Sequence, residues 1–505
     1  MRRWIPPVLV GSALLGAIGA LLAESSQIRV ESRVTPRAAL YPGPDDALIR
    51  FPLAPGLERY AGIDGRRMHA LVVEQAAISR RYRDQGHPKF WGRITGTSSD
   101  AESAEWLAGK FTAAGLSDVR RQALALPPQW MPQRWEVGLD ANGRHLVLES
   151  AQPAYRANAL PRDGVSLDAV YVGLGSEADF LGKDVAGKAV FVFNMIGLRD
   201  EGALGRADER GAALIVEVDM LPGNMRYQAY PSGTKAPVFT VGSDDGFSAR
   251  DLIVAAAGRA KVTATLDVDL VPNLSSALVW GTLPGATDET VYLVAHRDGW
   301  FDASGDNAGG VASIVGLAEY FAKRPRAERR RTLVFVGLDG HHNSGEGAGV
   351  GRRWMWDHRS ELFTRTALMI NAEHPSTVQT SVRPRYVSGD VIVRADTYMP
   401  QQWYAGGPSR RVLEDIAVKA FRDFGASMWL DPVPRPPAGD LGVFFRGVPG
   451  VATSEFFHYF HTDQETPDTV PWTGLEATTR AYAMIVDEVN RLDLAALQRP
   501  EEPVP

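Results

Sequence analysis

The stretch at residues 291–310, VYLVAHRDGWFDASGDNAGG, combines a strand, a polar loop and the start of a helix. Residues 291–295 are apolar and have the length of a buried strand, and they lead to His296, Asp298 and Asp306. Apolar residues then recur at helical spacing, so we expect Asp306 to lie just before a helix. Open α/β sheets place their sites at the carboxyl ends of strands. A lone histidine–aspartate pair is more often a solvated loop, so a site here requires further ligands.

Three other segments carry polar residues near an expected strand end. The apolar run 332–338 leads into DGHH, the run 368–370 leads into NAE, and EFFHYFHTDQETPD lies near the C-terminus. The candidate ligands in these segments are His341, His342, Glu373, His458 and His461. Each of them alone is more often a satisfied surface group. Four such loops that converge on one edge of a sheet would instead form a site.

The absence of cysteine limits the chemistry of that site. A chain of 505 residues without cysteine has no disulfide, no thiolate zinc site and no thiol nucleophile. Any bound metal must therefore be held by histidines and carboxylates. The net charge of −6, without long acidic or basic blocks, argues against nucleic acid as a partner.

The N-terminus predicts export. Arg2 and Arg3 precede an uncharged run at residues 4–23, which is about the length that spans a bilayer, roughly 20 residues. We therefore expect residues 1–23 to be a signal peptide or a transmembrane signal anchor. The positive-inside rule then leaves the folded body outside the cytoplasm, either periplasmic or membrane-anchored.

The remaining chain divides by pattern into an irregular lead-in and three folded segments. Strands alternate with helices in the last segment, which predicts an α/β fold with a mainly parallel sheet and helices on both faces. The expected segments are a lead-in at 24–65, the N-terminal part of an α/β domain at 66–150, a β-rich insert at 155–272 and the rest of the α/β domain at 275–495. Helices are expected at 68–83, from a capping box of Ser99 and Glu102 to Gly115, and at 310–321, 409–424 and 474–491.

Several of these motifs resemble known families. The insert, with GKAVFV, RGAALIV and PVFTVG, resembles a protease-associated domain. HRDGW, GDNAGG, RRTLVFVGLDG, INAE and FHTDQET resemble the di-zinc aminopeptidase and glutamate carboxypeptidase family, including its transferrin-receptor branch. The resemblance implies that 66–150 and 275–495 form a zinc peptidase domain with the zinc exopeptidase fold. It also implies one or two Zn²⁺ ions and a peptide substrate.

The resemblance also implies a role for each matching residue. His296 and Glu373 would complete one zinc site, His342 and His461 would complete the other, and Asp306 would bridge both ions. Asp298 would accept the proton on the far nitrogen of His296 and fix its tautomer.

The chain departs from the family pattern at the residues that carry the chemistry. The family has two adjacent glutamates, a general base and a zinc ligand, where this chain has His341 and His342. Neutral imidazole is a common zinc ligand and a legitimate base near neutral pH, so we expect His342 to bind metal and His341 to act as the base. Glu346 could replace that base only if the loop is rearranged. Phe460 stands where the glutamate carboxypeptidase branch has a tyrosine that steadies the oxyanion.

Together these patterns predict an exported zinc metallopeptidase, a hydrolase that acts as an aminopeptidase or carboxypeptidase in proteolysis. Two alternatives remain open at this stage. The histidine pair favours a catalytically impaired relative that serves as a binding or scaffold protein. A weakened second metal site would also suit acyl transfer at a single zinc.

Overall fold

The computed structural model describes the chain from residue 52 onward, with gaps. The described residues are 52–194, 202–219, 221, 223–342, 349–377, 379–384, 391–396, 402–403, 410–426, 428–429, 439–444, 447–453, 457 and 459–498. Residues 1–23, Glu346 and His458, which the sequence analysis singled out, lie outside this set. Among the described residues, no helix has both the length and the apolar character needed to cross a membrane.

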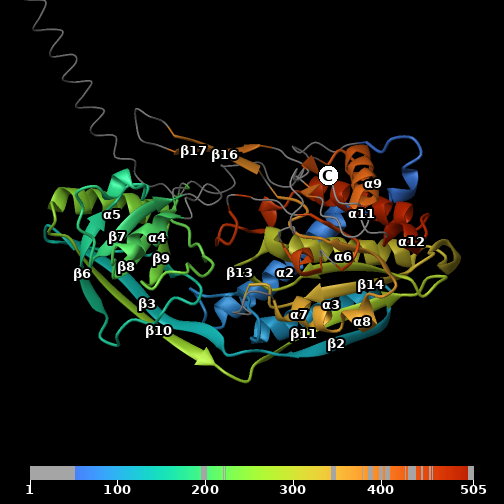
Figure 1. Ribbon diagram of the computed structural model, residues 1–505, viewed down its shortest axis with the longest axis horizontal. Coiled ribbons are helices and arrows are strands. Elements are labelled where there is room, and N and C mark those ends of the chain that lie inside the picture. The colour runs from blue at the N-terminus through green and yellow to red at the C-terminus, as the bar shows by residue number, and fades with distance from the viewer. Residues whose placement is uncertain are drawn as a thin grey trace, which may run out of the picture. The chain divides into compact units, whose positions relative to one another are not determined.

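A six-stranded sheet forms the centre of the α/β region (Figure 1). Its strand order is β2 (Ser117–Ala125), β11 (Ser275–Leu283), β14 (Thr332–Leu338), β12 (Thr290–His296), β15 (Thr366–Asn371) and β20 (Gly450–Ala452). The last four strands pair in parallel, while β2 and β11 are antiparallel additions at one edge. The mainly parallel sheet expected from the sequence is thus confirmed.

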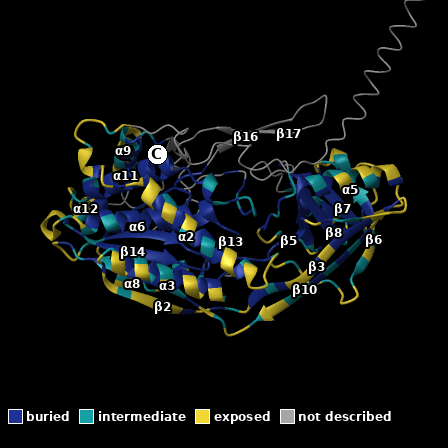
Figure 2. Ribbon diagram, turned by 180° about the vertical axis from the view of Figure 1, so that it is seen from behind, coloured by how far each residue is buried: buried dark blue, intermediate teal, exposed yellow. Residues whose placement is uncertain are grey.

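Helices cover both faces of this sheet because its strands are apolar on both sides. Along β12, Val291, Leu293 and Ala295 belong to one core cluster, whereas Tyr292 and Val294 belong to another. The first cluster packs against α2 (Gly65–Asp84), α3 (Ser98–Ala113), α6 (Gly309–Ala322), α9 (Arg410–Asp423), α11 (Trp472–Val489) and α12 (Leu494–Leu497). The second packs against α7 (Val350–Asp357), α8 (Arg359–Leu362) and α10 (Leu441–Phe444). Figure 2 shows α6 almost wholly in the buried colour, whereas α2 presents exposed residues on its outer side.

The expected helices are present, but the second one begins differently. Helix α3 begins at Ser98, and its N-cap residue is Thr97. The predicted capping box is wrong because its two members have other partners: Ser99 Oγ accepts the N–H of Ile94, and Glu102 binds Arg81. The helix ends just before Gly115, which has a φ of +82°, a conformation that glycine adopts readily.

The β-rich segment forms a second sheet of eight strands. Its order is β4 (Arg144–Val147), β3 (Gln129–Ala141), β10 (Lys261–Val271), β6 (Val165–Tyr171), β7 (Ala189–Asn194), β8 (Leu214–Asp219), β9 (Val238–Val241) and β5 (Gln152–Pro153). Helices α4 (Gly202–Glu209) and α5 (Ser243–Ala256) accompany it. Because β3 pairs with β10 along its whole length, the sheet begins at Gln129, ahead of the boundary at 155 expected from the sequence.

Short strands complete the described structure. Strand β1 (Gly92–Arg93) pairs with β13 (Gly299–Trp300), directly after β12. Two further pairs are β16 (Gln379–Pro384) with β17 (Val391–Asp396) and β18 (Gln402–Trp403) with β19 (Met428–Trp429).

Candidate metal centre

The parallel strands bring the predicted ligands to one edge of the sheet. The register pairs His296 with Leu338, Val294 with Asn371 and Asn371 with Ala452, so β14, β12, β15 and β20 end within two residues of one another. The polar loops that follow these strands therefore meet. The residues placed there are His296 at the end of β12, Asp306 in the turn Ser304–Ala308, His342 after β14, Glu373 after β15 and His461 after β20. We call these five the proposed ligands; all are at least 97 % buried.

Asp306 lies at the centre of this group. Its Oδ1 is 2.9 Å from Nε2 of His296. Its Oδ2 is 3.0 Å from Nε2 of His342 and 2.9 Å from Nε2 of His461. The two carboxylate oxygens thus face two different sets of imidazole nitrogens, as a carboxylate that bridges two metal ions must.

The chemistry of these atoms fits a metal ion. His296 Nε2 and Asp306 Oδ1 are buried and lack hydrogen-bond geometry with any described residue, although they lie 2.9 Å apart. Nε2 of His342 and of His461 are only 3.1 Å apart and face the same oxygen. A set of imidazole nitrogens and carboxylate oxygens with no thiolate suits Zn²⁺.

Asp298 orients a different histidine from the one expected. Its carboxylate is 3.7 Å from Nδ1 of His296, which instead lies 3.1 Å from the backbone oxygen of Asp298. The carboxylate accepts the backbone N–H of His341 at 3.1 Å and that of His342 at 2.9 Å, and it lies 3.2 Å from Nδ1 of His342. Asp298 therefore turns Nε2 of His342 toward Asp306, and a backbone carbonyl orients His296.

His341 lies on the other side of the centre, beside His296 and Glu373. The rings of His296 and His341 stack with centroids 4.2 Å apart at 16°. One potential ligand atom from each of these three residues lies within 4.8 Å of the others. Glu373 is held there by Asn371, whose Nδ2 donates at 2.7 Å.

Asp440, which the sequence analysis did not identify, orients His341. Its Oδ1 is 3.0 Å from Nδ1 of His341 and accepts from Arg352 at 3.1 Å. Burial alone would raise the pKa of Asp440, but His341 and Arg352 outweigh it and lower that pKa to about 2. Asp440 reaches the site from the start of α10, and nothing in its local sequence marks it.

Two further residues that the sequence analysis missed contact the centre. Glu465 accepts the backbone N–H groups of Asp306 at 2.7 Å and of His461 at 2.9 Å, so it fixes two proposed ligands at once. Burial and the Asp306 carboxylate raise its pKa to about 8. His374 places Nε2 3.1 Å from Asp306 Oδ1. Glu465 lies in the motif FHTDQET, and His374 directly follows Glu373. Closeness in sequence to a predicted ligand was therefore the signal that could have identified both.

The two histidines that face Asp306 Oδ2 have pKa values shifted in opposite directions. Burial lowers the pKa of His342, but the Asp306 and Asp298 carboxylates outweigh burial and raise it to about 10. Burial, together with the neighbouring His342, lowers the pKa of His461 to about 3. A metal that binds both nitrogens must displace any proton held there.

Two arginines, the buried Arg93 and the exposed Arg80, fix the loop between His296 and Asp306. Arg93 donates to the backbone oxygens of Arg297 at 2.7 Å, Asp302 at 2.8 Å and Ala303 at 3.0 Å. Arg80 adds a charged contact to the Asp302 carboxylate at 2.5 Å. This loop carries Asp298 and leads to Asp306, so these arginines support both.

Aromatic side chains surround the His342 and His461 rings. Trp300 has its ring centroid 4.8 Å from that of His342 and 4.7 Å from that of His461. Phe460 stacks on His461 at 3.5 Å. Tyr230, from the β-rich segment, lies 4.8 Å from His461. Burial, followed by the Asp306, Glu373 and Asp298 carboxylates, raises the pKa of Tyr230 well above its usual value.

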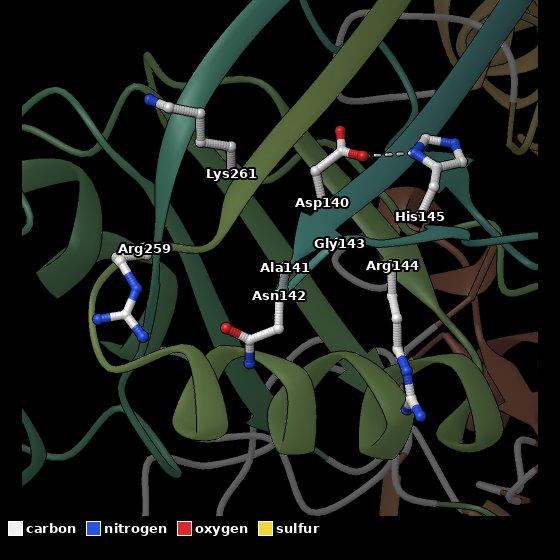
Figure 3. A pocket seen from close by; sticks show the side chains of 8 residues that line it. All are labelled: Asp140, Ala141, Asn142, Gly143, Arg144, His145, Arg259 and Lys261. Carbon is white, nitrogen blue, oxygen red and sulfur yellow. Dashed lines mark hydrogen bonds and ion pairs between the residues drawn. The ribbon is translucent and has the colours of Figure 1, made fainter.

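A separate pocket of about 390 Å³ lies at the hairpin between β3 and β4 (Figure 3). Its lining residues are Asp140, Ala141, Asn142, Gly143, Arg144, His145, Arg259 and Lys261. Asp140 is 2.9 Å from Nδ1 of His145, and Lys261 binds Asp168. None of the proposed ligands lines this pocket, so it is distinct from the metal centre.

Part of the chain, including the centre, matches one family model. Residues 279–486, less than half of the 505-residue chain, match the model of Peptidase family M28. That stretch includes all five proposed ligands. No curated protein sequence matches the chain.

Three solved structures share the fold. A Peptidase M28 precursor from Shewanella amazonensis SB2B superposes with a TM-score of 0.62 at 17 % identity, over 84 % of this chain and 96 % of that one. BSAP, a zinc aminopeptidase from Bacillus subtilis, gives 0.61 at 17 % identity, over 84 % and 95 %. An aminopeptidase from Aneurinibacillus sp. strain AM-1 gives 0.55 at 16 % identity, over 89 % and 98 %. At these identities the likeness establishes the α/β fold expected from the sequence.

Proposed function

We propose that this chain is an exported zinc-dependent metallopeptidase, and specifically an exopeptidase that removes terminal residues from short peptides. The observation that carries this proposal is the arrangement around Asp306, whose two oxygens face His296 on one side and the His342–His461 pair on the other. The match to Peptidase family M28 over this region and the fold shared with two aminopeptidases support it. The exopeptidase part rests on the resemblance seen in the sequence motifs.

The reaction requires one proton to move. A water oxygen bonds to the carbonyl carbon, the C–N bond breaks, and the proton that leaves the water ends on the amine nitrogen. Zinc held by the proposed ligands would supply the positive charge that acidifies water and polarises a carbonyl group. His341 is placed to carry the proton, because its Nδ1 faces Asp440 and its Nε2 remains for transfer.

Asp440 allows a histidine to act as the general base of this reaction. A glutamate base becomes neutral when it accepts a proton, whereas His341 becomes a cation in a site that already holds positive metal charge. The Asp440 carboxylate, 3.0 Å from the ring, offsets that new charge and fixes the ring orientation. The substitution of the usual glutamate therefore has a compensating partner.

The geometry does not favour the scaffold and acyl-transfer alternatives. A metal-free scaffold would bury Asp306 among four histidines and leave His296 Nε2 without a hydrogen-bond partner among the described residues, which is costly. A single-zinc centre would leave one oxygen of Asp306 without a metal, although both face histidines.

Hydrolysis of terminally blocked peptides tests this proposal. With zinc added, we expect the protein to cleave short peptides. A chelator should stop this cleavage, and blocking one terminus of the peptide should abolish it. Parallel peptides with an acetylated N-terminus or an amidated C-terminus identify which end the enzyme requires. Cleavage of peptides blocked at both ends would overturn the exopeptidase assignment. A zinc-loaded protein that cleaves none of the peptides would overturn the peptidase assignment.

We also propose that residues 1–23 export the folded body. Arg2 and Arg3 before the uncharged run support this proposal. A reporter that is active only in the periplasm, fused after Pro505, should give signal with the full chain and none when residues 1–23 are deleted. Equal signal from both fusions would rule out export by this segment.

A further inference from the structure

A segment of the β-rich region is attached to the loop that carries His461. Tyr227 forms an antiparallel bridge with Thr462. The backbone N–H of Gln228 donates to the backbone oxygen of His461 at 3.0 Å, and that of Asp463 donates to Arg226 at 3.1 Å. Because of these hydrogen bonds, residues 226–230 and the metal-centre loop are held in register. The position of Tyr230 is thus fixed relative to His461.

The Tyr230 ring lies against the metal centre. Its centroid is 4.8 Å from that of His461, in an edge-to-face arrangement, and 5.9 Å from that of His342, nearly parallel. It also lies 5.6 Å from Trp300. The residue keeps 37 % of its surface exposed although its hydroxyl is desolvated by the surrounding protein, so it borders both solvent and the centre, as a residue that contacts substrate must.

We call Tyr230, Trp300 and Phe460, which surround His461, the aromatic wall. It contains two hydrogen-bond donors that no described residue accepts. The Tyr230 hydroxyl makes no hydrogen bond with a described residue. The indole N–H of Trp300, a side chain that is only 1 % exposed, also lacks a partner among the described residues. Buried donors are usually satisfied, so unused donors beside a reactive centre indicate a ligand acceptor. Phe460, which stacks on His461 from the same wall, has no donor to offer.

We propose that Tyr230 is a catalytic residue whose hydroxyl donates a hydrogen bond to the carbonyl oxygen of the scissile peptide bond. This inference rests on the proposed peptidase function. When water adds to the carbonyl carbon, the C=O π electrons move onto that oxygen, which gains negative charge. They return when the C–N bond breaks, and the phenol proton stays on Tyr230 throughout. A donor aimed at this oxygen acts mainly in the transition state, so it affects kcat more than KM.

The test compares Tyr230→Phe with Tyr171→Phe in the zinc-loaded full chain. Loss of one oxyanion donor typically costs about 10²–10³-fold in kcat, so we expect a fall of about 100-fold for Tyr230→Phe with KM and zinc content little changed. Tyr171 lies on β6 in the same region, where its ring packs against Phe193 at 5.3 Å, so Tyr171→Phe should leave kcat unchanged. Unchanged or increased kcat in Tyr230→Phe would overturn the proposal; an increase would mean that the hydroxyl obstructs the centre.

A rescue variant distinguishes a catalytic from a merely structural role. Phe460 stacks on the same histidine, so Phe460→Tyr returns a hydroxyl to the wall. We expect kcat of the double variant Tyr230→Phe, Phe460→Tyr to be at least about tenfold higher than kcat of Tyr230→Phe. A double variant no more active than Tyr230→Phe, with intact zinc content, would contradict a donor role at this wall.

An affinity measurement separates this inference from the proposed function. A phosphinic dipeptide mimics the tetrahedral carbon and its charged oxygen without being cleaved. We expect its Kd to rise about 100-fold in Tyr230→Phe and to stay constant in Tyr171→Phe. Unchanged affinity in Tyr230→Phe overturns the role of Tyr230 even if the wild type hydrolyses peptides. A Tyr230-dependent affinity in a protein that cleaves no peptide would support the donor role and contradict the peptidase assignment.

Discussion

Replacing Asp306 with Asn is expected to lower zinc-dependent peptide hydrolysis by more than about 100-fold. Substitutions of residues that only orient metal ligands typically cost 10–100-fold, and Asp306 contacts three proposed ligands directly. Asn keeps the size of the side chain but has one oxygen and no charge. It therefore cannot face both sets of imidazoles with an anionic oxygen. Steady-state kinetics at saturating zinc, with zinc content measured in the same samples, provide the test.

Asp298→Asn is the matched comparison for that variant. Asp298 lies in the same buried loop, and its carboxylate holds His342 rather than facing all the histidines. We therefore expect a smaller loss, of about 10–100-fold, that excess zinc partly restores. If Asp306→Asn retained wild-type activity and zinc content, the metal site would have to lie elsewhere.

Replacing His341 should have the second largest effect, and its direction depends on Asp440. General bases typically contribute about 10²–10⁴-fold, so His341→Ala should lower kcat within that range. His341→Glu restores the residue type usual in the related family, yet we expect it to lower kcat too. The new carboxylate would lie beside the anionic Asp440 and close to Glu373, where like charges repel.

His341→Glu, made with and without Asp440→Asn, shows whether His341 is a base supported by Asp440 or an impaired base. Asp440→Asn removes the negative charge beside residue 341, so it should lower the activity of the wild type and raise that of His341→Glu. If His341→Glu alone is faster than the wild type, His341 is an impaired base and Asp440 does not compensate for it. Zinc content, measured in each variant, shows whether the change acts through metal binding.

The sequence predicted the parts of the site that depend on strand ends. His296, His342 and Glu373 follow apolar runs that could be recognised as strands, and parallel pairing brings such ends together. The same reasoning gave the α/β fold. Periodicity identified the helices but not the start of α3, because Ser99 and Glu102 bind partners outside the helix end.

What the sequence could not predict depends on contacts between distant segments. Asp440 is almost one hundred positions from His341, and no local pattern connects the two. Tyr230 belongs to the β-rich insert, for which the sequence predicts no site residue, and contacts such as the bridge between Tyr227 and Thr462 bring it to His461. The sequence predicted His296 as the partner of the Asp298 carboxylate, whereas the structure shows His342. The difference arises from the directions of the side chains, which residue spacing does not specify.

Zinc content of the purified full-length protein tests the central claim most directly. After incubation with zinc and removal of the excess, elemental analysis should find at least one zinc per chain, together with a rise in Tm that a chelator reverses. The variant Asp306→Asn, His461→Ala should lose that zinc and that rise in Tm while remaining folded. A wild-type protein without zinc, or a double variant with the full wild-type zinc content, would contradict the metal centre described here.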